Sequence, residues 1–163
     1  MIRLETRLAL RGIDGEAITD FMLSCDDERY RAWWPGVHLQ FHTLVHRPGF
    51  VGSVVYMDEY VGRRRLRMKA SVEEVQPGRR IVWRMLWLFR LPVRLFLELS
   101  PRSAGLELVH RIEAGFRGAG LLMDPLWRLF FSRAFANAMD EHARTEFPRL
   151  AALLGTERPK QGG

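Results

Sequence analysis

The C-terminal segment 121–154 constrains the fold of this chain more than any other part of the sequence. Its apolar residues recur at the spacing of an α-helix: Phe131, Phe135, Ala138, Met139, Leu150 and Leu153. Asp124 and Pro125 precede them, as an N-cap and a first-turn proline do, so we predict a long helix from there. His142 and Glu146, one turn apart, fall on the same stripe. A stripe that should be buried therefore carries an imidazole beside a carboxylate.

The rest of the chain consists mainly of predicted strands. Apolar and polar residues alternate in seven stretches: 2–11, 37–46, 51–60, 63–75, 81–89, 93–99 and 106–116. Two short helices are predicted between the first two strands, one capped by Asp14 and one over 26–34 that ends before Pro35 and Gly36. Pro92 is expected to break the run before 93–99. Short Gly/Pro turns between consecutive strands indicate an antiparallel meander.

This order of elements predicts an α+β fold in which one helix covers one curved sheet. The apolar face of the sheet must be covered, and only the C-terminal helix is long enough to cover it. We expect a single domain over 1–154 and a polar, disordered tail over 155–163. The oligomeric state is left as monomer or homodimer.

The gap between a curved sheet and a single helix predicts a cavity for a small hydrophobic ligand. We expect inward-facing residues to line this cavity: Phe41, Val55, Met57, Met68, Trp83, Met85, Trp87, Leu108, His110, Phe131, Phe135 and Met139. Large residues on sheet faces are usually core, and this is the alternative for most of them. His110 is more typical of a core histidine whose hydrogen bonds are satisfied than of a metal ligand.

Composition argues against several other classes of partner. The net charge of +6 comes almost entirely from arginines spread along the chain, and the dense run 63–69 alternates with apolar residues, as the solvated face of a strand does. We therefore expect no nucleic-acid partner. No stretch approaches the roughly 20 apolar residues of a membrane span, so stable membrane insertion is not expected. The single cysteine, Cys25, fits a reducing cytoplasm.

His142 and Glu146 are the candidate metal ligands. Residues four apart on a helix have Cβ atoms about 5–6 Å apart, close enough to share a divalent ion. The alternative is that they merely satisfy one another. Further ligands would come from the sheet: Glu59, in phase with Met57, and one of the histidines His38, His42, His46 and His110. Strand residues four apart are about 13 Å apart, so only one of the first three histidines can join.

The order of elements resembles the START-like helix-grip fold of the SRPBCC, or polyketide cyclase/dehydratase, superfamily. The resemblance covers residues 1–154, and its most specific parts are 30–35 (Tyr-Arg-Ala-Trp-Trp-Pro), 57–63, 74–81 and the last helix. Members of this superfamily generally hold an apolar small molecule between sheet and helix. Some are enzymes, and many only bind or carry their ligand.

A narrower resemblance concerns the candidate ligands. The diacetylphloroglucinol and phloretin hydrolase branch is similar in having a histidine after a Trp/Pro turn, a glutamate on the following strand and His-x-x-x-Glu on the last helix. The resemblance implies a zinc site made of His38, Glu59, His142 and Glu146, with His42 as the substitute for His38. It also implies cleavage of a carbon–carbon bond between an acyl group and an aromatic ring.

Two classes of function remain open from the sequence. The first is a binding protein whose cavity holds an aromatic, polyketide-like or lipid ligand, with or without the His/Glu metal site. The second is an enzyme, either a zinc-dependent hydrolase of an acylated aromatic compound or a polyketide cyclase/dehydratase. The position of the four candidate ligands relative to one another distinguishes a metal site from a mutually satisfied pair.

Overall fold

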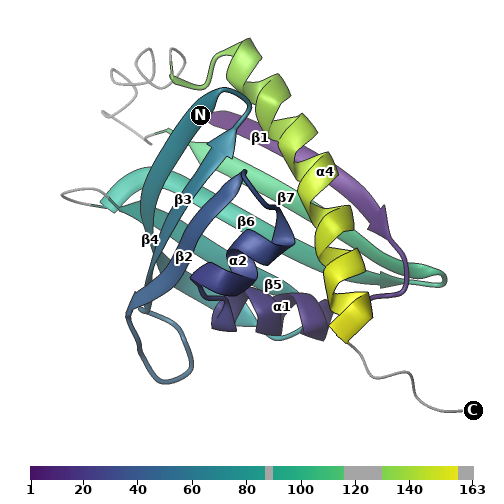
Figure 1. Cartoon of the computed structure of the whole chain (residues 1–163). Coiled ribbons are helices and arrows are strands. Elements are labelled where there is room, and N and C mark those ends of the chain that lie inside the picture. The colour runs from purple at the N-terminus through teal and green to yellow at the C-terminus, as the bar shows by residue number, and fades with distance from the viewer. Residues whose placement is uncertain (87–89, 116–129, 158–163) are drawn as a thin grey trace, which may run out of the picture.

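The computed structural model describes residues 1–86, 90–115 and 130–157 (Figure 1). The elements follow the predicted order: β1 (Ile2–Leu10), α1 (Gly15–Ser24), α2 (Asp27–Trp33), β2 (His38–Val45), β3 (Val54–Val61), β4 (Arg64–Gln76), β5 (Arg80–Leu86), β6 (Arg90–Arg102), β7 (Gly105–Ala114) and α4 (Arg133–Glu157). Within these ranges, no helix is both long enough and apolar enough to cross a membrane.

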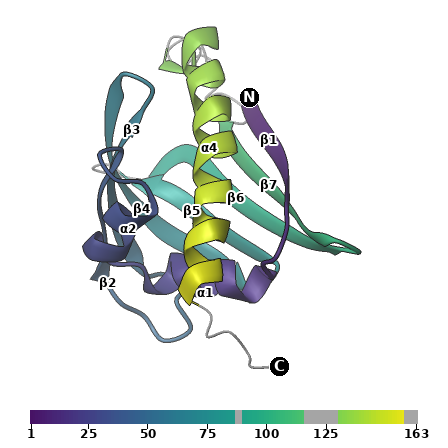
Figure 2. The same ribbon diagram turned by 45° about the vertical axis from the view of Figure 1, so that its right-hand side comes forward.

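The strands form one sheet of seven in the order β1-β7-β6-β5-β4-β3-β2. Every pairing is antiparallel, and β2 to β7 follow one another as hairpins while β1 closes the sheet beside β7. The sheet is curved, and α4 crosses its concave face (Figures 1 and 2). The predicted seven-stranded antiparallel sheet around a C-terminal helix is therefore confirmed.

The two short helices begin and end where the sequence predicts. Asp14 and Asp26 are the N-caps, and their side chains accept hydrogen bonds from the backbone N–H groups of Ala17 and Arg29, each at 2.8 Å. The second helix ends at Trp33, two residues before Pro35. Gly36 then adopts a positive φ of 79°, which a glycine accepts without strain.

The predicted C-terminal helix is interrupted just before α4. Phe131 and Ser132 are not helical, and α4 starts at Arg133. Ser132 caps it: its Oγ accepts from the Phe135 N–H at 3.3 Å and its carbonyl oxygen from the Ala136 N–H at 2.9 Å. Asp124 and Pro125, the predicted start, lie outside the described residues. The helix also continues to Glu157, beyond the predicted domain boundary at residue 154.

Two predicted strand boundaries were wrong. Pro92 does not end a strand but lies inside β6. It lies opposite the register irregularity between Arg84 and Leu86 on β5, and pairing with β7 begins only at the next residue, Val93. The missing N–H of Pro92 therefore interrupts no regular row of hydrogen bonds. Residues 51–53 belong to the connection before β3, which is closed by the Arg47 N–H donating to the Ser53 Oγ at 2.9 Å.

Close packing between α1 and the β4–β5 turn predicts the effect of one substitution. A Cβ on Gly15 would lie 2.0 Å from the Gly78 carbonyl oxygen, and Gly78 is held by its N–H donating to the Thr19 Oγ1. We expect Gly15→Ala to lower the free energy of unfolding by about 3 kcal/mol, the upper range for overpacking. Gly155→Ala is the matched control, because its Cβ meets nothing within 4 Å. Chemical denaturation should show the control unchanged or slightly stabilised, and equal effects would contradict the predicted clash.

Candidate metal centre

Four side chains converge where α4 crosses β2 and β3. His38 begins β2, Glu59 lies on β3, and His142 and Glu146 lie on α4. One ligand atom from each lies within 4.8 Å of all the others, and all four residues are buried. These are the four residues that the resemblance implied as zinc ligands.

The spacing of the four donor atoms fits a single small cation. The His142 Nε2 lies 3.3 Å from Glu146 Oε2 and 3.7 Å from Glu59 Oε2, and the His38 Nε2 lies 3.4 and 3.8 Å from the same two oxygens. Four ligands about 2.1 Å from a tetrahedral zinc ion stand about 3.4 Å apart. Among the described residues, neither Nε2 has a hydrogen-bond partner, although both are buried. Buried nitrogens that face carboxylates at these distances without a hydrogen bond are what a bound cation would satisfy.

A β-bulge brings His38 into the cluster. Strict alternation along β2 would place His38 outward with Gln40 and His42, but the register with β3 shifts between His38 and Gln40. His38 and Phe41 consequently both point inward and are fully buried. Thr43 and Val45, farther along β2, lie on the exposed end of the strand.

The structure separates His38 from the other candidate histidines. The His42 Nδ1 contacts the Asp27 Oδ1 at 2.8 Å, and the ring is 38% exposed, outside the cluster. His46 is exposed and meets the ring of Phe50. His110 is buried on β7 with its ring 5.7 Å from that of Phe147, and it lines the adjacent cavity without joining the four ligands.

Aromatic residues from α2 and the turn after it hold the cluster in place. The Tyr30 ring stacks on His38 with centroids 4.1 Å apart, and its hydroxyl donates a hydrogen bond to the Glu59 Oε2. The Trp34 ring stacks on His142 at 4.9 Å. The Trp33 Nε1–H donates to the Glu146 carbonyl oxygen at 2.6 Å and ties α4 to α2. Neighbouring side chains that contact metal ligands in this way hold those ligands in orientation.

The roles of Tyr30 and Trp34 were not predicted from the sequence. The signal was present in the spacing of Tyr30 and Trp33, which are three apart on one short helix and therefore share its buried face. The resemblance marked residues 30–35 as specific but assigned none of them a role.

The charged groups of the cluster shift one another's pKa values. Burial alone would lower the pKa of His142, but contacts with Glu146 and Glu59 outweigh burial and raise it to about 10. Burial would raise the pKa of Glu146, but His142 and His38 lower it to about 2. Burial and the neighbouring Glu59 together raise the pKa of Tyr30 well above its ordinary value, so Tyr30 stays a hydrogen-bond donor. Two buried carboxylates within a few ångströms of each other therefore require positive charge beside them.

A cavity of about 410 Å³ adjoins the cluster between the sheet and the N-terminal half of α4. Glu59, His142 and Glu146 form part of its wall. Seven of the residues expected to line a cavity do so: Met57, Met68, Met85, His110, Phe131, Phe135 and Met139. The wall also contains apolar residues outside the expected set: Leu66, Leu86, Leu91, Val93, Leu95, Ile112 and Phe130.

Four of the expected cavity residues belong to the core instead. Phe41 packs against Tyr30, with ring centroids 5.3 Å apart. Val55, Trp83 and Leu108 are buried one inward position away from the lining residues Met57, Met85 and His110 on the same strands. The cavity thus occupies only one end of the concave face, and the other end is solid. Trp87 lies outside the described residues.

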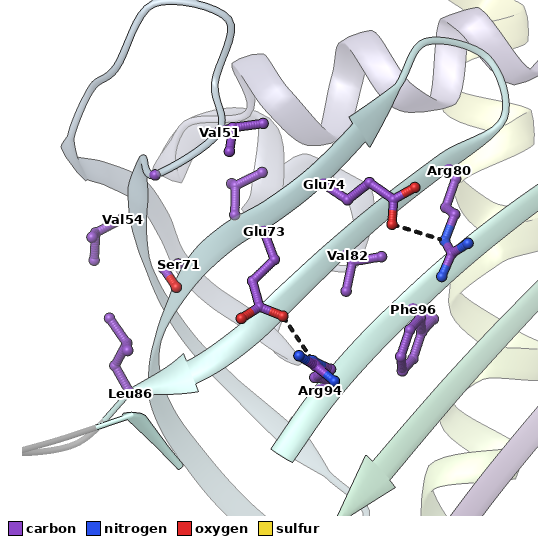
Figure 3. A pocket seen from close by; sticks show the side chains of 12 residues that line it. Val51, Val54, Ser71, Glu73, Glu74, Arg80, Val82, Leu86, Arg94 and Phe96 are labelled. Atoms are coloured by element: carbon purple, nitrogen blue, oxygen red, sulfur yellow. Dashed lines mark hydrogen bonds and ion pairs between the residues drawn. The ribbon is translucent and has the colours of Figure 1, made fainter. Parts of the chain in front are cut away.

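A second hollow lies on the opposite, outer face of the sheet (Figure 3). It has a volume of about 640 Å³ and is floored by Val82 and Phe96. Its charged groups pair with one another: Glu73 with Arg94 at 2.7 Å and Glu74 with Arg80 at 3.6 Å. This hollow is larger than the inner cavity but is separated from the cluster by the sheet, so we assign the ligand site to the inner cavity.

Comparison with known proteins establishes the fold. No family model matches the chain, and no curated protein matches it significantly in sequence. Protein MLL2253 from Mesorhizobium loti is similar in structure at 14% identity, with a TM-score of 0.62, over 97% of this chain and 100% of that one. The chain has the helix-grip fold. Major latex-like protein 151 from Panax ginseng shares it at 11% identity and a TM-score of 0.57, over 86% of this chain and 96% of that one.

The raised pKa of His142 predicts how the stability of the metal-free protein depends on pH. A group whose pKa rises on folding stabilises the native state fully below its unfolded pKa, here 6.5, and loses that contribution as pH rises to about 10. In EDTA we expect the free energy of unfolding to fall over this range, by at most about 1.4 kcal/mol per pH unit for one proton. Denaturant titrations should show a shallower fall in His142→Gln and an unchanged one in His46→Gln. An identical slope in all three proteins would refute the assignment.

Proposed function

We propose that His38, Glu59, His142 and Glu146 hold one divalent cation, with zinc as the preferred ion. The observation that carries this proposal is the convergence of four buried donor atoms at spacings close to the edges of a zinc tetrahedron. Imidazole nitrogen and carboxylate oxygen are both common zinc ligands, and the absence of a thiolate is compatible with the ion. The ion would also neutralise the two buried carboxylates.

The cavity beside the cluster is proposed to bind a small hydrophobic ligand, either aromatic, polyketide-like or lipid. Its wall is made largely of aliphatic and aromatic side chains, with Glu59, His142, Glu146 and His110 as its buried polar groups among the described residues. Four methionines line it: Met57, Met68, Met85 and Met139. Methionine adapts its shape and makes favourable contacts with aromatic rings, which suits a ring-bearing ligand.

The arrangement supports a hydrolase acting on an acylated aromatic compound as the more specific function. Zinc bound here would polarise a carbonyl oxygen and lower the pKa of water. The residues of the chain would do the rest: Tyr30 orients Glu59, Trp33 fixes the turn of α4 that carries Glu146, and the apolar wall positions a ring and excludes bulk water. The exposure of Glu59, His142 and Glu146 to the cavity supports this proposal.

A second candidate is a binding protein without chemistry. Its support is the ligand count, because four protein ligands are typical of closed, structural zinc sites, whereas catalytic sites usually keep one position open. The Glu59 oxygen nearest the histidines also accepts the Tyr30 hydroxyl, so it is already committed. We also propose descent from the START-like superfamily, in which polyketide cyclases and dehydratases form a further class of enzyme that uses such a cavity.

Metal analysis of protein purified without an affinity tag or chelator tests the site. We expect about one equivalent of zinc per chain, and a fall of at least about tenfold in His142→Ala because a lost ligand opens the site. His42→Ala is the matched control, since that ring pairs with Asp27 outside the cluster. Tyr30→Phe should bind zinc about 10–100-fold more weakly while staying folded. Equal metal content in His142→Ala and His42→Ala would eliminate the proposed centre.

Cavity binding is tested by filling the cavity. N-phenyl-1-naphthylamine, a neutral fluorescent probe, should bind the unmodified protein. Met139→Trp should weaken binding at least about tenfold, because the larger side chain occupies the volume the probe needs. Met85→Trp provides a second blocking variant, and Leu44→Trp, at an exposed site, is the control. Thermal melts confirm folding of each variant. Undiminished probe affinity in both folded blocking variants would place the ligand elsewhere.

A further inference from the structure

The inner cavity opens at a chemically distinctive part of the surface. Of its described lining residues, four are exposed: Arg65, Arg67 and Lys69 on β4, and Phe130 before α4. The tip of the β3–β4 hairpin lies at the same end of the molecule as the first turns of α4 (Figures 1 and 2). A Cβ on Gly62, in that tip, would lie 3.1 Å from the Cβ of Ala138 on α4. The hairpin and the start of α4 therefore frame the mouth.

Positive charge is concentrated beside this mouth. The hairpin strip, defined as residues 63–69, carries five exposed cationic side chains: Arg63, Arg64, Arg65, Arg67 and Lys69. Asp58 pairs with Arg65 at 2.8 Å and with Arg67 at 3.5 Å. The other three contact no carboxylate of the described residues. One carboxylate against five cations leaves an excess of four positive charges, most of the chain's net charge of +6.

An exposed aromatic ring stands next to the strip. Phe130 is 45% exposed, and the Arg64 guanidinium lies 5.8 Å from its ring centroid. The same guanidinium donates a hydrogen bond to the Phe130 carbonyl oxygen at 3.3 Å. A basic strip with an exposed phenylalanine beside its Arg64 gives the composition of surfaces that lie in the headgroup region of a bilayer, where the cations meet anionic headgroups and the ring meets acyl chains.

We propose that the hairpin strip and Phe130 dock this protein on a lipid bilayer rich in anionic phospholipid, with the cavity mouth facing the membrane. The proposal rests on the proposed function only in taking the cavity ligand to be hydrophobic: such a ligand partitions into bilayers, and docking lets it enter the cavity without crossing water. The contact is peripheral. A nucleic acid is disfavoured as the partner because Asp58 ties two of the five cations, and the exposed phenylalanine adds apolar surface that a phosphate backbone does not use.

Vesicle co-sedimentation tests the proposal with the full chain. The probes are sucrose-loaded vesicles of phosphatidylcholine alone and of phosphatidylcholine with one quarter phosphatidylglycerol, at low and high salt. We expect binding to the anionic vesicles at low salt and its loss at high salt, where charges are screened. A basic residue near an anionic leaflet contributes about fivefold in partitioning, so Arg63→Ala/Arg64→Ala/Lys69→Ala should weaken binding about a hundredfold. Phe130→Ala should weaken it by roughly three- to tenfold.

A second triple variant separates local docking from general charge. Arg11, Arg47 and Arg79 are exposed and lie in the β1–α1, β2–β3 and β4–β5 connections, at the other end of the molecule (Figures 1 and 2). Replacing all three by alanine removes the same charge and should lower binding by no more than about threefold. Equal losses in the two triple variants, or no preference for anionic vesicles, would overturn the proposal. The proposal would also be overturned if the protein bound single-stranded DNA through the hairpin strip but did not bind the vesicles.

These outcomes are independent of the metal site. Sedimentation is repeated in EDTA, where binding should be unchanged because no proposed zinc ligand belongs to the strip. A protein that holds zinc and the fluorescent probe but ignores anionic vesicles would refute docking and leave the proposed function standing. A protein that binds anionic vesicles but neither zinc nor the probe would refute the proposed function and leave docking standing.

Discussion

The contact between α4 and the strands β2 and β3 rests on four buried ionisable side chains. His142 and Glu146 would be costly on the buried face of a helix if they met only apolar residues. His38 and Glu59 supply the complementary groups, and Tyr30, Trp33 and Trp34 fix all four in place. The position of α4 along the sheet is therefore specified by polar geometry as well as by apolar packing. If the helix were displaced by one turn, two carboxylates and two imidazoles would lie in the interior without their partners.

Most of the fold could be predicted from the sequence because its signals are local. Alternation of apolar and polar residues locates the strands, Asp14 and Asp26 mark the starts of the short helices, and glycine and proline mark the turns. Prediction failed where tertiary context decides. Pro92 lies within a strand because its partner strand is irregular there, and the predicted helix is interrupted at Phe131 and Ser132, where Ser132 caps α4.

The candidate site was predictable in part for the same reason. His142 and Glu146 can be recognised from helical spacing alone, and Glu59 from its phase with Met57. His38 could not be chosen over His42 by alternation, because a one-residue bulge reverses the facing of the first residue of β2. The resemblance supplied that choice. The extent of the cavity was not predictable either: Val55, Trp83 and Leu108 face the same side as residues that line it, and only the position of α4 and the short helices decides which are covered.

Because the cavity is restricted to one end of the concave face, ligand choice and stability depend on different residues. The end that contains Val55, Trp83 and Leu108 belongs to the buried core, so it can supply cooperative stability without reference to any ligand. The end that contains the methionines and Phe131 leaves volume unfilled and has less to lose when a side chain changes size. Substitutions that retune ligand choice are thus partly insulated from those that unfold the chain. A fold divided in this way can change its ligand over evolution while the core residues that stabilise it stay the same.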